Sequence, residues 1–258
     1  MKTTWQPISV LTQQAFLRIL RNAGLSETLA RTVTELPQSV MADRIITLLK
    51  EESFEPSGEY KYARSTMGRN FLGIEEAMVH LGVSMARTER DVLSYIPFSR
   101  ATLRSVRDTH LLVALPACSL FGIRSRVPHE LFAAQQGAWY EKQPFATHVH
   151  EPSWCLLRKE PLSTQPNRTW DEQCSDLKET EEVPCAYAVV YGTVVYFLSR
   201  GMRLFEMTMV RTANLDQGGS RVIVGNFSEK TGVHIDGCHD MHRTEDVGIA
   251  VCLQHELP

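Results

Sequence analysis

Apolar positions recur with a helical period over the first 50 residues of the chain. Those between Leu11 and Leu20 fall on one face at this period, and Gly24 follows where such a helix would end. The pattern predicts two further helices, at about 26–36 and 40–50. The start of the chain is therefore expected to form a small helical region.

A polar stretch follows these helices. Residues 53–66 include Pro56 and Gly58, two residue types that interrupt regular structure. We predict a linker at 53–66, between a helical N-terminal region at 1–52 and a main domain at 67–258.

The main domain begins with a mixture of helix and strand patterns. Residues 70–83 carry a helical apolar stripe, whereas 110–116 and 153–162 contain apolar runs of strand length. Residues 184–201 predict a helix, with proline at its start and glycine just past its end. A bilayer span needs about 20 apolar residues, so this tyrosine-containing segment is interpreted as a core helix. The order of elements predicts an α+β fold.

The C-terminal part is predicted to be rich in strands. Segments 204–212 and 220–227 flank a DQGG turn, and 247–254 is expected to be a closing strand. The polar stretch GVHIDGCHDMHRTED, residues 232–246, therefore lies between two strands, as a loop or as a short strand with loops.

Composition and charge limit the classes of partner. The chain is 43% hydrophobic and 22% charged, with a formal net charge of −3. These values are typical of a globular protein without the basic field that nucleic-acid or membrane binding requires. Six cysteines without a CxxC pair indicate reduced thiols. With no secretory signal evident, a cytoplasmic location is expected, or export by a route that the sequence does not show.

The stretch 232–246 admits two interpretations. His234, Cys238, His239 and His242 are ligand types that zinc accepts. Their spacing matches no zinc motif, however, and adjacent residues of an extended segment point to opposite faces. An exposed polar segment is therefore the preferred interpretation, and neither a metal nor another cofactor is predicted.

Two other stretches resemble ligand sites. HVHE at 148–151 has alternating histidines, which are also common on half-exposed strands. QPNRTWD at 165–171 resembles the calcium and sugar loop of some lectins, but the acidic segment that should follow is wrongly spaced. We interpret it as a turn that leads into a helix starting near Thr169.

Motifs with a clear catalytic mechanism are missing from the sequence. There is no GxSxG, P-loop, GxGxxG or HExxH pattern. A nucleophilic Cys238 or Cys252 with His239 or His242 as its base is one alternative, but a cysteine in an apolar strand is more often a small buried side chain. No catalytic residue is assigned, and a binding protein is favoured over an enzyme.

A series of motifs runs from Met67 to the end of the tail in a distinctive order and spacing. They read MGRNFLGIEEAMVHLGV, DTHLLVAL, WY, SWCLLRKEPL, TWDEQ, EEVPCAYAVVY, GMRLFEMTMVR and RVIVGNF, with HD and R before a final VGIA. This series resembles a family of bacterial proteins whose C-terminal ends are similar to the variable proteins of diversity-generating retroelements. The resemblance implies a C-type lectin-like fold, of the branch shared with formylglycine-generating enzymes. It also implies a ligand-binding surface in which selected codons are rewritten by mutagenic reverse transcription.

The resemblance assigns two kinds of position in the tail. Framework positions are matched by Gly225, Phe227, Gly232, Asp240, Arg243 and Gly248. The changeable positions are His234, Asp236, Gly237, Cys238, His239, Met241, His242, Thr244, Glu245 and Asp246. The ligand-binding residues that the resemblance implies are His234, Asp236, Cys238, His239, Met241, His242, Arg243, Thr244, Glu245 and Asp246, and the partner would be a protein or a small molecule.

Two other functional classes stay open at this point. An oxidase related to formylglycine-generating enzymes would need two cysteines converging on copper, for which Cys238 and Cys252 are the late pair. An interaction protein would instead bind through its helical N-terminus.

Overall fold

The computed structural model describes residues 26, 28, 56–133, 137–162 and 167–256. The chain divides into two compact units, Met1–Phe54 and Glu55–Pro258, and the second is described below. The helices predicted within 1–52 lie outside the described residues, apart from the isolated positions Ser26 and Thr28.

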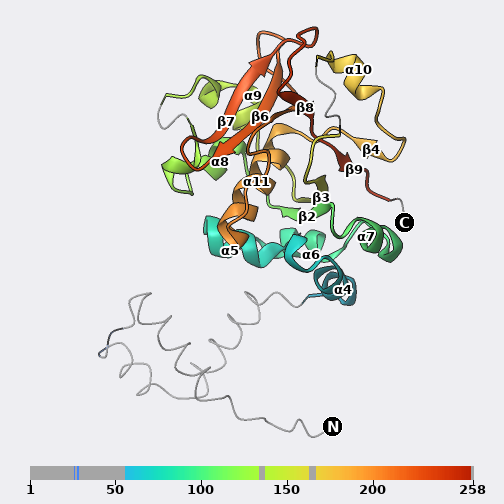
Figure 1. Cartoon of the computed structure of the whole chain (residues 1–258). Helices are drawn as coiled ribbons and strands as arrows, with labels where there is room; N and C mark the ends of the chain where they lie inside the picture. Colours follow the sequence, from blue (N-terminus) through green and yellow to red (C-terminus); the bar gives the residue numbers. More distant parts are fainter. Residues whose placement is uncertain (1–25, 27, 29–55, 134–136, 163–166, 257–258) are drawn as a thin grey trace, which may run out of the picture. The chain divides into compact units, whose positions relative to one another are not determined.

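The second unit is a mixed α and β domain with two sheets (Figure 1). One sheet has the strand order β1-β2-β3-β9-β4, with β1 parallel to β2 and the other pairs antiparallel. Its strands are β1 (Phe71–Leu72), β2 (His110–Leu115), β3 (Ser153–Arg158), β4 (Glu181–Glu182) and β9 (Cys252–Leu253). The other has the order β7-β6-β5-β8, with β8 parallel to β5. Its strands are β5 (Met209–Leu215), β6 (Arg221–Ser228), β7 (Gly232–Cys238) and β8 (Val247–Ile249).

Helices cover and connect the two sheets. The α-helices are α4 (Gly58–Met67), α5 (Ile74–Leu81), α6 (Arg87–Ser94), α7 (Arg100–Val106), α8 (Leu120–Arg124), α9 (Pro144–Thr147), α10 (Trp170–Cys174) and α11 (Ala186–Arg200). The described residues also form the short 3-10 helices η1 (Gly68–Asn70), η2 (His129–Leu131) and η3 (Trp139–Lys142). These elements confirm the α+β prediction.

Helix α11 forms the centre of the domain because it packs against strands of both sheets (Figure 1). The predicted core helix is confirmed, and Gly201 ends it in a left-handed conformation with φ 68°. The tyrosines of α11 are buried, and the hydroxyl of Tyr187 donates to the carbonyl of Pro116 at 2.6 Å. A Cβ at Gly192 would lie 2.9 Å from Leu157 of β3, so glycine lets the helix approach that sheet closely.

The predicted linker is helical in its second half. Ser57 caps α4 by accepting a hydrogen bond from the amide of Tyr60 at 3.1 Å. Tyr60, Ala63 and Met67 are buried on one side of α4, which contacts α7 and β1. The prediction of a linker at 53–66 is therefore wrong from Ser57 onward. The buried face of α4 consists of a few apolar residues that stand between polar ones in the sequence.

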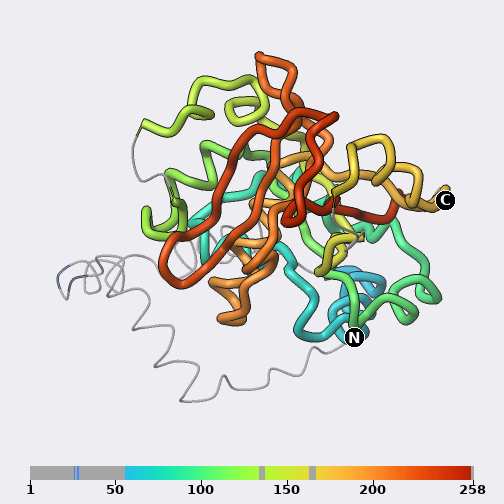
Figure 2. Tube along the Cα trace, turned by 45° about the horizontal axis from the view of Figure 1, so that its top comes forward, coloured from blue at the N-terminus to red at the C-terminus, as the bar shows by residue number. Residues whose placement is uncertain are grey.

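The last strand segment serves both sheets instead of one. The chain leaves β8 at Ile249, continues through buried Ala250 and Val251, and enters the five-stranded sheet as β9. Figure 2 shows this C-terminal segment, in dark red, crossing the domain toward the end of the chain. The prediction of one closing strand at 247–254 is corrected to two short strands that join the sheets.

Among the described residues, no helix is long and apolar enough to cross a bilayer. The longest of these helices, α11, is instead the buried centre of the domain.

Candidate functional site

The tail predicted as a binding segment begins as strand β7 and continues as a loop, residues 239–246, which we call the tail loop. In β7, Val233 and Ile235 are buried, whereas Asp236 is exposed. The register pairs Val224 with Ile235 and Arg221 with Cys238, so the start of the tail loop is held next to β6. The tail loop lies at the top of Figure 1.

A buried arginine supports the tail loop from below. Arg211, in β5, is 0% exposed. Its guanidinium donates to the carbonyl of His242 at 2.6 Å and to Oε1 of Gln173 at 2.6 Å. It also donates to the carbonyl of Arg168 at 3.2 Å and contacts Sγ of Cys238 at 3.6 Å. These neutral acceptors tie the tail loop and α10 to the sheet through one side chain.

A second arginine fixes the start of the tail loop. Arg221 binds the carboxylate of Asp240 through two nitrogens, at 3.1 and 2.8 Å. Its guanidinium carbon lies 3.9 Å from the ring centroid of Trp170, and the amide of Trp170 donates to the carbonyl of Asp240 at 2.9 Å. A bidentate pair stacked on an aromatic ring restricts both partners to one geometry. Asp240 is therefore held in place next to β6.

The second half of the tail loop is tied to the start of α10. Arg243 binds Glu172 at 2.6 Å and the carbonyl of Asn167 at 2.7 Å. The amide of Asn167 donates to the carbonyl of Thr244 at 3.0 Å. Bonding to the backbone of Thr169 and then to Arg243 holds the pKa of Glu172 below its usual value. The predicted helix start near Thr169 is confirmed, since Thr169 caps α10.

Seven of the ten predicted binding residues are exposed, and six of these, all except Arg243, form no ion pair with the described residues. We call these six the tail surface: Asp236, His239, Met241, His242, Glu245 and Asp246. Their side-chain hydrogen bonds to the described residues are local, from the amide of Gly237 to Asp236 and from the amide of Met241 to His239. The backbone around them is fixed by other groups, so these side chains are available to a partner.

The structure places the other four predicted binding residues differently. Cys238 is only 7% exposed and packs with Met209 and Ile223, so its assignment to an exposed surface is wrong. Cys238 shares a face of β7 with exposed Asp236, but its thiol lies against the buried guanidinium of Arg211, which covers it. Arg243 is occupied by Glu172, and the hydroxyl of Thr244 is buried without a hydrogen-bond partner in the described chain.

His234, the remaining predicted residue, faces a different part of the surface. It is half-buried and lines a cavity of about 430 Å³ together with Glu130, Phe132 and Lys230. The tail surface is therefore smaller than the predicted set, and His234, near the start of β7, is not part of it.

Framework glycines are required by close backbone contacts. Gly225 has φ +153°, and a Cβ there would lie 2.1 Å from the carbonyl oxygen of Thr208. At Gly232, with φ +70°, a Cβ would lie 2.7 Å from the backbone of Phe132. Neither site accepts a side chain without movement of the neighbouring backbone. Both glycines are therefore fixed by the packing of the backbone around them.

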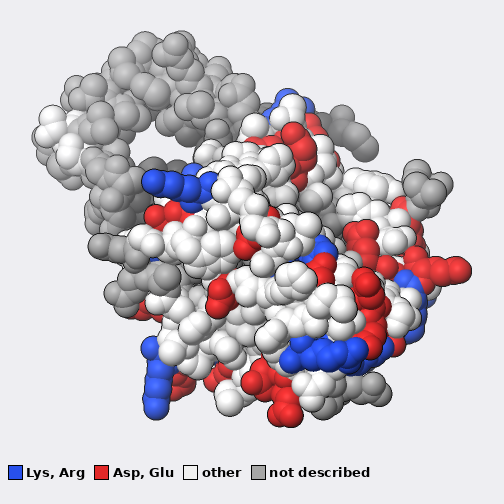
Figure 3. Space-filling model, turned by 90° about the horizontal axis from the view of Figure 1, so that it is seen from above, with Lys and Arg blue, Asp and Glu red and all other residues white. Residues whose placement is uncertain are grey.

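The end of the domain that carries the tail loop faces the viewer in Figure 3. Uncharged side chains cover much of this face, and basic groups gather next to acidic ones. The pairs Arg243–Glu172 and Arg168–Asp176 belong to the neighbourhood of α10. The tail surface itself contains no arginine or lysine, and its acidic groups are three exposed carboxylates.

The histidines and cysteines do not assemble into a metal centre in the part of the chain that the structure describes. No group of three or more His, Cys, Asp or Glu side chains there has the arrangement to hold a metal ion. In the HVHE stretch, the rings of His148 and His150 lie 4.9 Å apart, and His150 stacks on Tyr187 at 4.5 Å. Burial and then the neighbouring His148 lower the pKa of His150. This pair packs against α11 instead of forming a ligand cluster.

Removal of metal is expected to leave the protein unchanged. Treatment with EDTA followed by desalting should shift the melting temperature by less than about 1 °C, because a bound structural metal would contribute directly to folding. Scanning calorimetry and elemental analysis of the untreated protein provide the measurement. A stoichiometric metal, or a clear chelator-dependent loss of stability, would contradict the expectation.

The cysteine pair considered for copper does not converge. Cys238 belongs to β7 and Cys252 to β9, in different sheets. Cys252 instead contacts Cys155, and this contact and burial raise its pKa. A thiol with a raised pKa is a poor nucleophile. The geometry gives no support to catalysis by Cys238 with Cys252, and the sequence showed no signal for the contact with Cys155.

Comparisons with known proteins identify no relative of this chain. No family model matches the chain, and it has no significant match among curated proteins or solved structures. The family resemblance therefore stays an expectation from the sequence motifs, whereas the structure itself shows an α+β domain with two sheets.

Proposed function

We propose that this protein is a ligand-binding protein that presents the tail surface on a C-type lectin-like scaffold, in the manner of the variable proteins of diversity-generating retroelements. The partner is a protein or a small molecule recognised by carboxylate, imidazole and thioether groups. The tail surface is the binding site in this proposal, and no catalytic residue takes part.

One observation carries the proposal: the groups that hold the tail loop differ from the groups that it exposes. Arg211, Arg221 and Asp240 anchor its backbone, and Trp170 packs on Arg221. The six side chains of the tail surface contribute only the two local bonds described above. A rigid backbone under replaceable side chains is what a diversified binding site requires.

The two-sheet domain supports the finer fold proposal. The tail is held by the smaller sheet and by α10, and the following segment continues into the larger sheet. A C-type lectin-like scaffold accounts for this separation of a fixed frame from an irregular, exposed loop. The close backbone contacts of Gly225 and Gly232 and the burial of Phe227 support the proposal that these positions belong to a fixed frame.

Single substitutions in the tail surface are expected to leave stability nearly unchanged. An alanine substitution at any one of its six positions should change the free energy of unfolding by no more than about 0.5 kcal/mol, as at exposed sites in general. These positions are Asp236, His239, Met241, His242, Glu245 and Asp246. Urea unfolding of each variant, followed by tryptophan fluorescence, measures the change.

Matched residues of the same type provide the control. Met209→Ala, at a residue 6% exposed, should cost about 2 kcal/mol or more, whereas Met241→Ala, at 67%, should cost little. Asp240→Ala should likewise cost more than Asp246→Ala, because it breaks the bond to Arg221. Equal losses within each pair would show that the tail surface is part of the core and would contradict the proposal.

Binding is tested by diversifying the tail surface. A displayed library randomised at these six positions, selected against several unrelated proteins, should yield folded binders whose binding is lost when the original residues return. A library with no folded members, or binders that are indifferent to these positions, would overturn the proposed role. In the genome, we expect a reverse-transcriptase gene nearby and a near-copy of the 3′ end of this gene that differs at adenines.

A further inference from the structure

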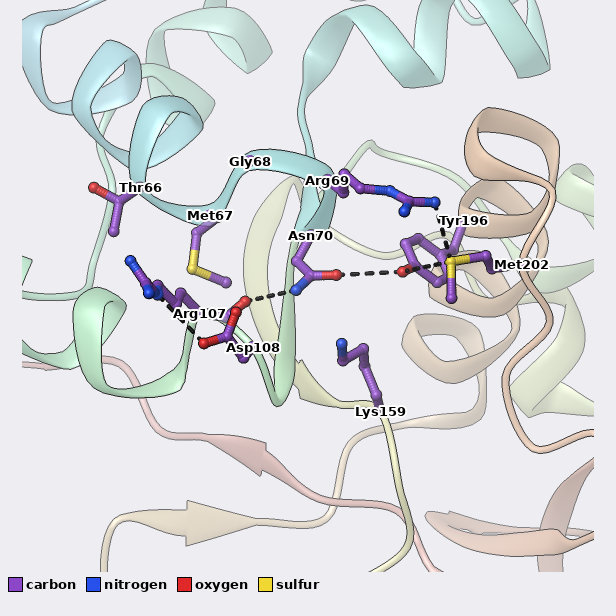
Figure 4. A pocket seen from close by; sticks show the side chains of 10 residues that line it. All are labelled: Thr66, Met67, Gly68, Arg69, Asn70, Arg107, Asp108, Lys159, Tyr196 and Met202. Carbon is purple, nitrogen blue, oxygen red and sulfur yellow. Dashed lines mark hydrogen bonds and ion pairs between the residues drawn. The ribbon is translucent and has the colours of Figure 1, made fainter.

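A second recess is lined by elements that lie at the other end of the domain from the tail loop in Figure 1, and Figure 4 shows its side chains. Its volume is about 380 Å³. The walls come from the end of α4, from η1, from the turn after α7, from the residue that follows β3, and from α11 with the segment after it. Segments far apart in the sequence thus meet around one cavity, and none of its residues belongs to the tail surface.

The floor of the recess is a hydrogen-bonded amide. Asn70 is 9% exposed, and its Nδ2 donates to the carbonyl of Arg107 at 2.5 Å. The hydroxyl of Tyr196 donates to Oδ1 of Asn70 at 3.3 Å (Figure 4). These bonds link η1, the turn after α7, and α11, so the floor is held by three elements.

Cationic side chains surround this floor. Arg69, Arg107 and Lys159 line the recess, and Asp108 is the one carboxylate among its lining residues. This surplus of positive charge is confined to the recess, since the whole chain has a formal net charge of −3. The backbone amide of Lys159 donates to the carbonyl of Thr109 at 3.0 Å, which positions this residue at the rim.

These cations are weakly compensated by the described residues. The guanidinium of Arg69 donates to Sδ of Met202 at 3.3 Å, and a thioether is a weak acceptor. Arg107 pairs only with Asp108 at 3.3 Å, where both side chains are more than half exposed. The amine of Lys159 has no ion pair or hydrogen bond in the described chain and points toward the Asn70–Tyr196 pair in Figure 4.

The remaining lining is suited to an organic group. The side chains of Met67 and Met202 and the ring of Tyr196 add apolar surface next to the cations. The cavity is in the range of about 300–1,000 Å³ that is typical of small-molecule sites. An inorganic ion alone would leave this apolar part unused.

We propose that this recess binds a small phosphate monoester with an aromatic or apolar substituent. Three cations against one carboxylate leave a surplus of two positive charges, which matches a dianion better than a carboxylate. Arg69 and Lys159 bind the phosphate oxygens by charge-assisted hydrogen bonds, and the substituent lies against Met67 and Met202. This site is independent of the function proposed for the tail surface.

Titration of the full chain with phenyl phosphate tests the site. At pH 7.5, calorimetry should give a Kd at or below about 1 mM, and inorganic phosphate should bind more weakly because it lacks the ring. Benzoate should bind at least about 5-fold more weakly than phenyl phosphate, since it carries a single charge. Lowering the pH to 5 should weaken phenyl phosphate binding several-fold, because the second pKa of a phosphate ester is about 6.

Two substitutions and their controls locate the binding. Lys159→Gln and Arg69→Gln should each weaken phenyl phosphate binding about 5- to 10-fold. Lys142→Gln and Arg104→Gln, at exposed cations elsewhere, should not change it. The side-chain amide of Asn70 should also shift in an NMR spectrum on addition of phenyl phosphate, and melting curves check that each variant is folded.

Three results would overturn the proposal. One is the absence of binding at 10-fold above the expected Kd. Another is an equal loss of affinity in the control variants, which would indicate nonspecific attraction. The third is benzoate binding as tight as phenyl phosphate at both pH values, which would assign the site to monoanions.

Discussion

Replacing Phe227 by alanine is expected to lower the free energy of unfolding by about 3–5 kcal/mol. The side chain is 1% exposed and meets the ring of Phe197 edge-on, with centroids 5.2 Å apart. The guanidinium carbon of Arg203 lies 5.2 Å from the same ring. Truncation removes buried apolar surface and leaves a cavity next to α11. Denaturant unfolding, monitored by fluorescence and circular dichroism, measures the loss.

A graded series separates this effect from a general sensitivity of the domain. Phe227→Leu keeps most of the volume and should cost less than about 2 kcal/mol, whereas Met241→Ala on the tail surface should cost about 0.5 kcal/mol or less. A loss below 1 kcal/mol for Phe227→Ala would mean that β6 and α11 do not form the frame beneath the tail.

Replacing Arg211 by methionine is expected to cost about 2–4 kcal/mol, although methionine preserves much of the side-chain volume. Removal of the guanidinium leaves the carbonyl of His242 and Oε1 of Gln173 without their donors. Each buried acceptor without a partner costs about 1–3 kcal/mol. The loss is partly offset because a buried charge is also removed. Unfolding in urea gives the total effect.

Hydrogen exchange tells whether the loss is centred on the tail loop. In the Arg211→Met variant, the amides of Trp170 and His242, both hydrogen-bonded in the native protein, should exchange faster than those of β2 and β3. Arg104→Met, on the exposed side of α7, is the control and should change neither stability nor exchange. Unchanged exchange at the tail loop in the Arg211 variant would contradict the anchoring role.

The sequence correctly predicted the helices whose start and end signals lie within the helix or next to it. Residues 184–201 carry proline at the start, glycine just past the end and an apolar run between them, and the structure forms α11 there. Thr169 and Glu172 form a capping box, which is visible in the sequence as a spacing of three residues. Such signals act within one or two turns, so no knowledge of the fold is needed to read them.

The linker prediction failed because the stability of helix α4 depends on contacts with distant parts of the chain. Pro56 and Gly58 suggested an interruption, but the chain after them becomes a helix through burial of Tyr60 and Met67 against the domain. A short helix with a polar composition gains most of its stability from tertiary packing, which a local pattern does not contain.

The candidate site was predicted as a segment but not as a surface. The sequence pattern placed 232–246 between strands, and its polarity indicated exposure, which the six side chains of the tail surface and Arg243 have. The same polarity gave no reason to exclude Cys238, because the side chains that bury it come from β5 and β6, which lie far from it in the sequence.

By itself, the sequence determined the elements with local signals: the central helix, the cap of α10, the strand-rich C-terminal half and the polar tail between two of its strands. Only the tertiary structure decided which residues anchor that tail. Arg211 looks like any charged residue near the start of a strand, and nothing near it in sequence shows that it is 0% exposed. It becomes an anchor because β5, α10 and the tail loop converge on it, bringing Gln173 and His242 within 2.6 Å of its guanidinium. Partners that lie tens of residues apart meet only when the chain has folded, since burial and hydrogen bonding depend on distance in space and not on distance along the chain.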